Sequence, residues 1–131
     1  MNFYQQQLLK IKTELYPPEA LVQQIVNAKL FIDSNFSDRN DVKDMAGEAF
    51  YSKFHFIRLF KNLYGRTPHQ YLKEVRIQHA KKMIREGASV SESCFAVGFS
   101  SPGSFSGLFK KMTGIPPSRI MPLVRNKKSQ F

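Results

Sequence analysis

The stretch LFKNLYGRTP, residues 59–68, returns as LFKKMTGIPP at residues 108–117. The two copies share leucine, phenylalanine, lysine, glycine and proline at one offset of 49 residues. A motif that recurs in order at a fixed spacing indicates a repeated structural unit. This repeat decides which fold the sequence predicts.

Helix signals surround the first copy. Ser52 can cap a helix and Gly65 can end it. Just before this helix, Asp41 can cap a shorter one. The inner face of the longer helix would carry Phe56, Leu59, Phe60 and Leu63. A short helix, a turn and a second helix with a bulky inner face form the layout of a helix-turn-helix.

The second copy follows the same order. A short helix from about Ser91 to Val97 leads into the turn GFSS, and Ser101 with Pro102 opens a helix that Gly114 ends. The apolar positions of that helix are Phe105, Leu108, Phe109 and Met112. The sequence therefore predicts a second helix-turn-helix.

A long helix is predicted between the two copies. Thr67 can cap it, Pro68 suits its first position, and it would run to about Arg85. Its apolar positions are Leu72, Val75, Ala80, Met83 and Ile84. Such a helix is about 28 Å long, close to the distance of about 34 Å between successive major-groove openings on one face of B-DNA. A rigid spacer of this size suits two helices that read adjacent grooves.

The remaining sequence is also helical in pattern. Apolar residues recur at helical spacing before Pro17, and again in a helix that begins near Glu19; they are Tyr4, Leu8, Ile11 and Leu15, then Leu21, Ile25, Ala28 and Ile32. The prediction is an all-α protein. Its expected parts are an N-terminal amphipathic extension (1–18), a first helix-turn-helix subdomain (19–65), a linker helix (66–86), a second subdomain (87–121) and a mobile basic tail (122–131).

Positive charge lies in the duplicated part of the chain. The formal net charge is +10 at pH 7. Residues 1–40 carry four Lys or Arg and four Asp or Glu, whereas residues 41–131 carry sixteen against six. Such a field attracts polyanions, with nucleic acid the first expectation and an anionic membrane the second. A solvated basic surface is the alternative that charge alone leaves open.

Several other function classes lack the residues they need. There is no run of 18 apolar residues and no signal peptide, so a cytoplasmic protein without membrane contact is expected. Cys94 is the only cysteine, and His55, His69 and His79 show no paired ligand spacing, so no metal or other cofactor is expected. No nucleophile, acid–base pair or phosphate-binding glycine loop is evident, and the sequence does not predict an enzyme.

Two longer stretches carry a more specific pattern, SKFHFIRLFKNLYGRTPHQYLKEVRIQHAKKMI at 52–84 and VGFSSPGSFSGLFKKMTGIPPSRI at 97–120. The residues that form it are Phe60, Lys61, Gly65, Pro68, Tyr71, Leu72, Arg76, Ala80, Gly98, Phe99, Ser101, Phe109, Lys110, Gly114 and Pro117. In this pattern, residues 21–120 resemble the DNA-binding domain of the AraC/XylS transcription regulators. The resemblance implies a homeodomain-like fold of seven helices and bacterial transcription control at the nucleoid, with double-stranded DNA and RNA polymerase as partners.

The outward face of the first reading helix supplies the first candidate DNA contacts. The candidates are Ser52, Lys53, Phe54, His55, Ile57, Arg58 and Lys61. Arg58 matches an arginine that contacts bases in family members, and it can pair with guanine O6 and N7. Phe54 and Ile57 suit thymine methyl groups or, alternatively, the neighbouring subdomain. Lys61 suits a phosphate or solvent, and His55 is expected to reach DNA nearby.

The second reading helix departs from the family pattern. Its candidates are Ser101, Pro102, Gly103, Ser104, Ser106, Gly107 and Lys110. Gly107 stands where family members usually have an arginine, and a glycine at 103 or 107 costs a helix about 1 kcal/mol relative to alanine. We therefore expect the first subdomain to supply most sequence discrimination, while the second adds backbone contacts and shape readout.

Three further expectations concern the whole chain. The alternative to a sequence-specific regulator is a basic helical adaptor that binds proteins and binds DNA weakly and nonspecifically. By the resemblance, Arg76 is expected to brace the two subdomains through an ion pair. The chain is expected to be a stand-alone regulator that binds DNA as a monomer, with dimerisation through residues 1–18 as the alternative.

Overall fold

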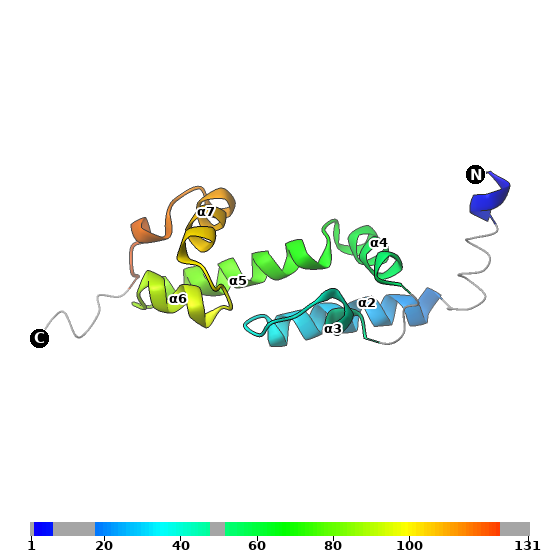
Figure 1. Ribbon diagram of the computed structural model, residues 1–131, viewed down its shortest axis with the longest axis horizontal. Helices are drawn as coiled ribbons and strands as arrows, with labels where there is room; N and C mark the ends of the chain where they lie inside the picture. Colours follow the sequence, from blue (N-terminus) through cyan, green and yellow to red (C-terminus); the bar gives the residue numbers. More distant parts are fainter. Residues whose placement is uncertain (1, 7–17, 48–51, 124–131) are drawn as a thin grey trace, which may run out of the picture.

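The computed structural model describes residues 2–6, 18–47 and 52–123. Within these residues all regular structure is helical and no strand occurs, which confirms the predicted all-α class. In this part of the chain, no helix combines the length and apolar character needed to cross a membrane. Figure 1 shows two groups of helices at the two ends of the long helix α5 (Pro68–Arg85).

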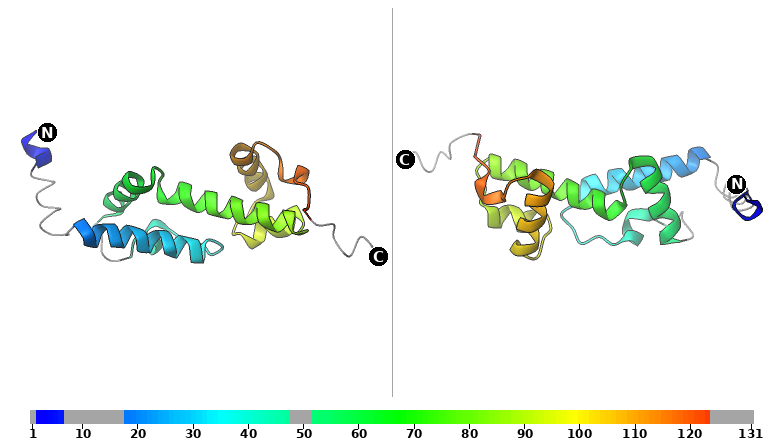
Figure 2. Two further views of the ribbon diagram at one scale, coloured as in Figure 1. Left: turned by 180° about the vertical axis from the view of Figure 1, so that it is seen from behind. Right: turned by 90° about the horizontal axis from the view of Figure 1, so that it is seen from above.

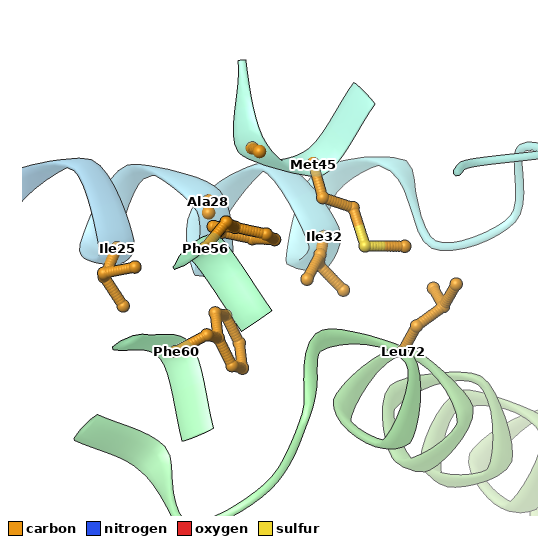
Figure 3. Packing of buried hydrophobic residues seen from close by; sticks show 8 residues of the cluster. Ile25, Ala28, Ile32, Met45, Phe56, Phe60 and Leu72 are labelled. Atoms are coloured by element: carbon orange, nitrogen blue, oxygen red, sulfur yellow. The ribbon is translucent and has the colours of Figure 1, made fainter. Parts of the chain in front are cut away.

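The first group contains α2 (Pro18–Asn35), α3 (Val42–Ala46), α4 (Lys53–Tyr64) and the beginning of α5. The short helix α3 has a capping box, in which the Asp41 side chain accepts the N–H of Asp44 and the Asp44 carboxylate accepts the N–H of Asp41. The buried side chains form one core (Figure 3), consisting of Ile25, Ala28, Ile32, Met45, Ala46, Phe56, Phe60 and Leu72. Full burial of a large apolar side chain stabilises the fold by about 1.5–3 kcal/mol, so this core anchors α4.

The second group contains the rest of α5, α6 (Val90–Ala96), α7 (Pro102–Thr113) and the 3-10 turn η1 (Pro117–Arg119). Its buried core consists of Ile77, Ala80, Ile84, Cys94, Val97, Phe105, Phe109 and Ile120. Burial raises the pKa of the Cys94 thiol, so this side chain is a protonated core residue at neutral pH. The buried Ser93 hydroxyl donates to the carbonyl of Ser89 at 2.8 Å, so it leaves no unsatisfied donor in this core.

Helix α5 joins the two cores as the sequence predicted. The Thr67 hydroxyl accepts the N–H of Gln70 at its start, and Pro68 occupies the first turn. Leu72 enters the first core, whereas Ile77, Ala80 and Ile84 enter the second. The helix has 18 residues, which is about 27 Å of rise. One continuous helix therefore belongs to both halves of the fold.

The two groups of helices are held together by contacts of Phe36, His79 and Arg76. Phe36, which follows α2, packs against both cores and stacks on His79 with ring centroids 4.0 Å apart. Arg76 on α5 donates to the carbonyls of Phe36 at 2.6 Å and Asp38 at 2.9 Å, and its guanidinium lies 5.8 Å from the Phe99 ring centroid. The expected brace is therefore present. Within the described residues its hydrogen-bond partners are backbone carbonyls, and the expected ion pair remains a prediction.

The buried faces of α4 and α7 are shorter along the helix than the apolar pattern predicted. Leu63 is 47% exposed and Met112 is 40% exposed, although both continue the apolar spacing of their helices. Each lies in the last turn of its helix, beyond the tightly packed phenylalanines. Periodicity identifies the face of a helix, but it does not say where along the helix the neighbouring element ends.

The predicted parts at the chain ends fall largely outside the described residues. Of the extension 1–18, residues 3–6 form a helical turn, in which Phe3 and Tyr4 are exposed. Of the tail 122–131, only Pro122 and Leu123 are described, and the Leu123 N–H donates to the carbonyl of Arg85 at 2.9 Å. The boundaries predicted for the extension, subdomains, linker and tail remain predictions.

Candidate nucleic-acid interface

Helix α4 is short and has a capping residue at each end. The Ser52 hydroxyl accepts the N–H of His55 at 3.1 Å, and Gly65 ends the helix with a left-handed φ of 76°. Phe56 and Phe60, one turn apart, point into the core with ring centroids 5.9 Å apart. Because the two rings hold one side of α4 against the core, the opposite side faces solvent.

The exposed side of α4 carries most of its predicted contacts. Lys53, Phe54, Arg58 and Lys61 are all exposed. Phe54 is 66% exposed, and the Lys53 ammonium lies 5.3 Å from the centroid of its ring. Apart from this contact, such an exposed ring has no packing role in the described fold and can meet a partner.

Three of the residues predicted to contact DNA from α4 are buried or half-buried. His55 is 3% exposed, so its expected reach to DNA is not supported by the structure. Ile57 is half-buried and packs against the first core, which fits contact within the protein, although with its own subdomain rather than the neighbour. Ser52 is half-buried, and its oxygen caps the helix.

Helix α7 repeats this design 49 residues later in the sequence. The Ser101 hydroxyl accepts the N–H of Ser104 at 3.4 Å, and Gly114 ends the helix with a φ of 87°. Phe105 and Phe109 point into the second core with ring centroids 5.6 Å apart. The repeated sequence therefore encodes one structural unit twice: a serine cap, a phenylalanine pair and a terminal glycine.

The predicted contact residues of α7 are small apart from one lysine. The exposed predicted residues are Ser101, Pro102, Gly103, Ser104, Gly107 and Lys110, whereas Ser106 is half-buried. A Cβ added at Gly107 would meet nothing within 4 Å, and one at Gly103 would meet only the Ser101 Oγ at 3.8 Å. The fold of the described chain therefore requires neither glycine.

Both helices carry positive charge, and both stand on the same side of α5. Neither α4 nor α7 contains an acidic residue, whereas together they carry Lys53, Arg58, Lys61, Lys110 and Lys111. In Figure 1 and in the reverse view of Figure 2, α4 and α7 stand on one side of α5, one near each end. This arrangement gives a polyanion two positively charged contact points held by one rigid helix.

The sequence did not predict one cleft, which the fold forms from residues of several elements. Arg39, from the α2–α3 loop, and His69, from the first turn of α5, line one cleft with Arg76. No motif marks them, because they lie 30 residues apart and belong to different elements. In the described residues no group of three or more His, Cys, Asp or Glu side chains is placed to hold a metal ion.

Comparison with known sequences places this arrangement in a family. A family model described as a helix-turn-helix domain matches residues 45–121, more than half of the chain. A protein from Photobacterium leiognathi named as the probable transcriptional regulator LumQ is 33% identical over 96 residues. The match covers 72% of this chain but only 39% of that relative. The matched segment thus spans well under half the length of this relative.

Solved structures give the same result. A transcriptional regulator from Chromobacterium violaceum with an AraC-type DNA-binding domain superposes with a TM-score of 0.67 and 26% identity, covering 73% of this chain and 87% of the other. The DNA-binding domain of the transcriptional factor AdpA, solved with a target DNA, gives a TM-score of 0.65 and 28% identity, covering 72% and 86%. The chain belongs to the AraC-type helix-turn-helix family of DNA-binding transcriptional regulators.

Proposed function

We propose that this protein regulates transcription by reading two adjacent major-groove segments of double-stranded DNA with α4 and α7. The observation that carries the proposal is the repeated reader: two capped, acid-free helices stand on one side of α5, which has 18 residues. Its rise of about 27 Å suits groove openings about 34 Å apart. A protein-interaction adaptor is not favoured by any of the comparisons.

Within this proposal, α4 supplies most of the sequence discrimination. Arg58 is the long, exposed donor on its outward face, and its guanidinium suits O6 and N7 of guanine. The exposed Phe54 ring suits a thymine methyl group. Lys53 and Lys61 supply phosphate contacts, which position the helix without reading sequence.

The role of α7 is different because its long exposed donors, Lys110 and Lys111, lie only in its last turn. Gly103 and Gly107 let the duplex approach the helix backbone closely, while Ser104 and Ser106 offer short hydroxyl contacts. We assign Lys110, with Ser101 and Pro102 at the helix start, to the phosphate backbone. Such a face reads groove shape more than base identity.

Replacing Arg58 tests this division of labour. Duplexes that bind the wild-type protein are first selected from a random-sequence library. Arg58→Ala should lower affinity for the selected duplex roughly 10- to 100-fold, because a bidentate base contact is worth about 1–3 kcal/mol. A repeated selection with the variant should show relaxed preference at one base pair.

Ser104→Ala and Ser106→Ala are the matched comparisons on α7. Each should change affinity for the selected duplex only a few-fold, because a neutral hydrogen bond contributes about 1 kcal/mol. If either serine variant relaxes base preference as much as Arg58→Ala does, α4 is not the main reader.

A transcription regulator of this kind acts at the nucleoid in the cytoplasm and needs RNA polymerase as a second partner. We infer both from the family to which the chain belongs, and we infer that one monomer engages DNA. Size-exclusion chromatography with light scattering on the complex tests the monomer. A mass of two chains per duplex would instead favour a dimer through residues 1–18.

A further inference from the structure

A polar cleft lies between the two halves of the molecule. It has a volume of about 660 Å³, and the polar residues that line it are Ser37, Arg39, Asn40, His69, Arg76 and Ser100. They come from the α2–α3 loop, from α5 and from the α6–α7 turn. In the right view of Figure 2 these two connections lie between α4 and α7 along the long axis of the molecule.

The walls of the cleft are held in place by contacts at its base. Arg76 ties the α2–α3 loop to α5 through the carbonyls of Phe36 and Asp38. Gly98 approaches that loop so closely that a Cβ there would lie 2.8 Å from the carbonyl oxygen of Ser37. The cleft is therefore a formed feature of the junction and does not depend on one flexible side chain.

The chemistry of the cleft suits an anion. Arg39 and His69 are exposed, and the serine hydroxyls and the Asn40 amide add neutral donors. Among the described residues that line it, none carries a carboxylate. The nearby Asp41 carboxylate accepts the N–H of Asp44 and so is used in capping α3. The Arg76 guanidinium already serves two carbonyls, which leaves Arg39 as the long cationic donor available to a ligand.

We propose that this cleft binds a backbone phosphate in the DNA segment between the two grooves that α4 and α7 read, with Arg39 as the charged donor and His69 beside it. The inference rests on the proposed function. A protein that reads successive major grooves on one face of a duplex must pass over the sugar–phosphate backbone between them. The connections that line the cleft lie between α4 and α7 in the right view of Figure 2, and the cleft offers cationic and hydroxyl donors.

The test uses the full chain and a duplex selected by the wild-type protein from a random-sequence library. Each phosphate of that duplex is replaced in turn by a neutral methylphosphonate, and affinity is measured by fluorescence anisotropy. The wild-type protein should lose affinity roughly tenfold at one or two phosphates between the segments contacted by the readers, because a charge-assisted hydrogen bond is lost there. Arg39→Ala should lose a similar factor on the unmodified duplex and should then be insensitive to the same replacements.

A salt series gives an independent readout. The slope of log affinity against log salt concentration should become shallower by about 0.9 in Arg39→Ala, the value for one phosphate contact. Arg39→Lys should restore most of the slope. Lys82→Ala is the matched control, because Lys82 is also exposed but lines a different surface of α5. It should leave both the slope and the methylphosphonate pattern unchanged.

The remaining outcomes separate this inference from the proposed function. If the wild-type protein binds its selected duplex specifically but no central phosphate matters, the cleft proposal is overturned and the proposed function stands. The same holds if Arg39→Ala remains sensitive at the same phosphates, or if methylphosphonates weaken binding equally at every position. If no duplex is enriched over random sequence, both proposals fail.

Discussion

Gly98 shows how one residue controls the junction between the two halves. Its φ of 102° lies in the region that favours glycine, and a Cβ there would meet the Ser37 carbonyl oxygen at 2.8 Å. Both the backbone conformation and the close contact therefore exclude a side chain. The neighbouring Arg76 would have to move as well, since its Cζ lies 3.1 Å from the same position.

Gly98→Ala should lower the free energy of unfolding by about 2 kcal/mol or more, because backbone strain and a clash with main-chain atoms add together. Gly65→Ala is the matched control, since Gly65 has a φ of 76° but nothing within 4 Å of its Cβ position. It should cost only about 1 kcal/mol. Urea unfolding measures both variants, and equal losses would show that the contact with Ser37 carries no energy.

Residue roles were predictable from sequence only where a helix position determined them. The exposure of Arg58 followed from the burial of Phe56 and Phe60 on the opposite side of α4. The burial of His55 did not follow, because it is not one of the apolar positions that mark the inner face of α4. The carbonyl partners of Arg76 lie 38 and 40 residues away and carry no sequence signal.

At the scale of elements, the outward faces of α4 and α7 differ in composition, because only α7 carries glycine there. Helix α7 has 12 residues, and Gly107 is the second glycine inside it. The described structure leaves open space where a Cβ of residue 107 would lie. A glycine inside a helix costs about 0.5–1 kcal/mol relative to alanine. We attribute the presence of Gly107, despite its cost to helix stability, to a close approach of DNA to α7 at this position.

Gly107→Ala should therefore raise the free energy of unfolding by about 0.5–1 kcal/mol and increase the melting temperature by a few degrees. The same variant should weaken binding to the selected duplex, because the added methyl group occupies the space that the duplex needs. Circular dichroism melting and fluorescence anisotropy measure the two effects. Higher stability with unchanged affinity would show that DNA does not approach α7 at this position.

Gly114→Ala is the control for this pair of effects. Gly114 ends α7 with a φ of 87°, so alanine there should destabilise the protein by about 1 kcal/mol. A rise in melting temperature for both variants would contradict the explanation from helix propensity.

The helices themselves were largely predictable from local signals. Serine caps, the Thr67–Pro68 start and the terminal glycines gave the bounds of α4, α5 and α7, because each signal acts within a few residues of the helix end. The exposure of Leu63 and Met112 was not predictable, because it depends on where the neighbouring helix ends.

At the scale of the whole molecule, two cores share one helix and are locked together at its middle. Phe36 packs against both cores, and Arg76 fastens the loop that carries it. The repeat in the sequence predicted two units and a rigid spacer. It did not predict the cleft between them, because the lining joins Arg39 and His69 of the first half to Gly98 and Ser100 of the second.

The most direct test of this account is to insert five base pairs between the two segments of the selected duplex that the readers contact, and to measure affinity at about 0.15 M salt. Five base pairs rotate one segment by about half a helical turn relative to the other. Because α5 holds the two readers rigidly on one side, only one can then engage, and affinity should fall by roughly tenfold or more. Unchanged affinity would contradict the claim that one chain reads two grooves through a rigid spacer.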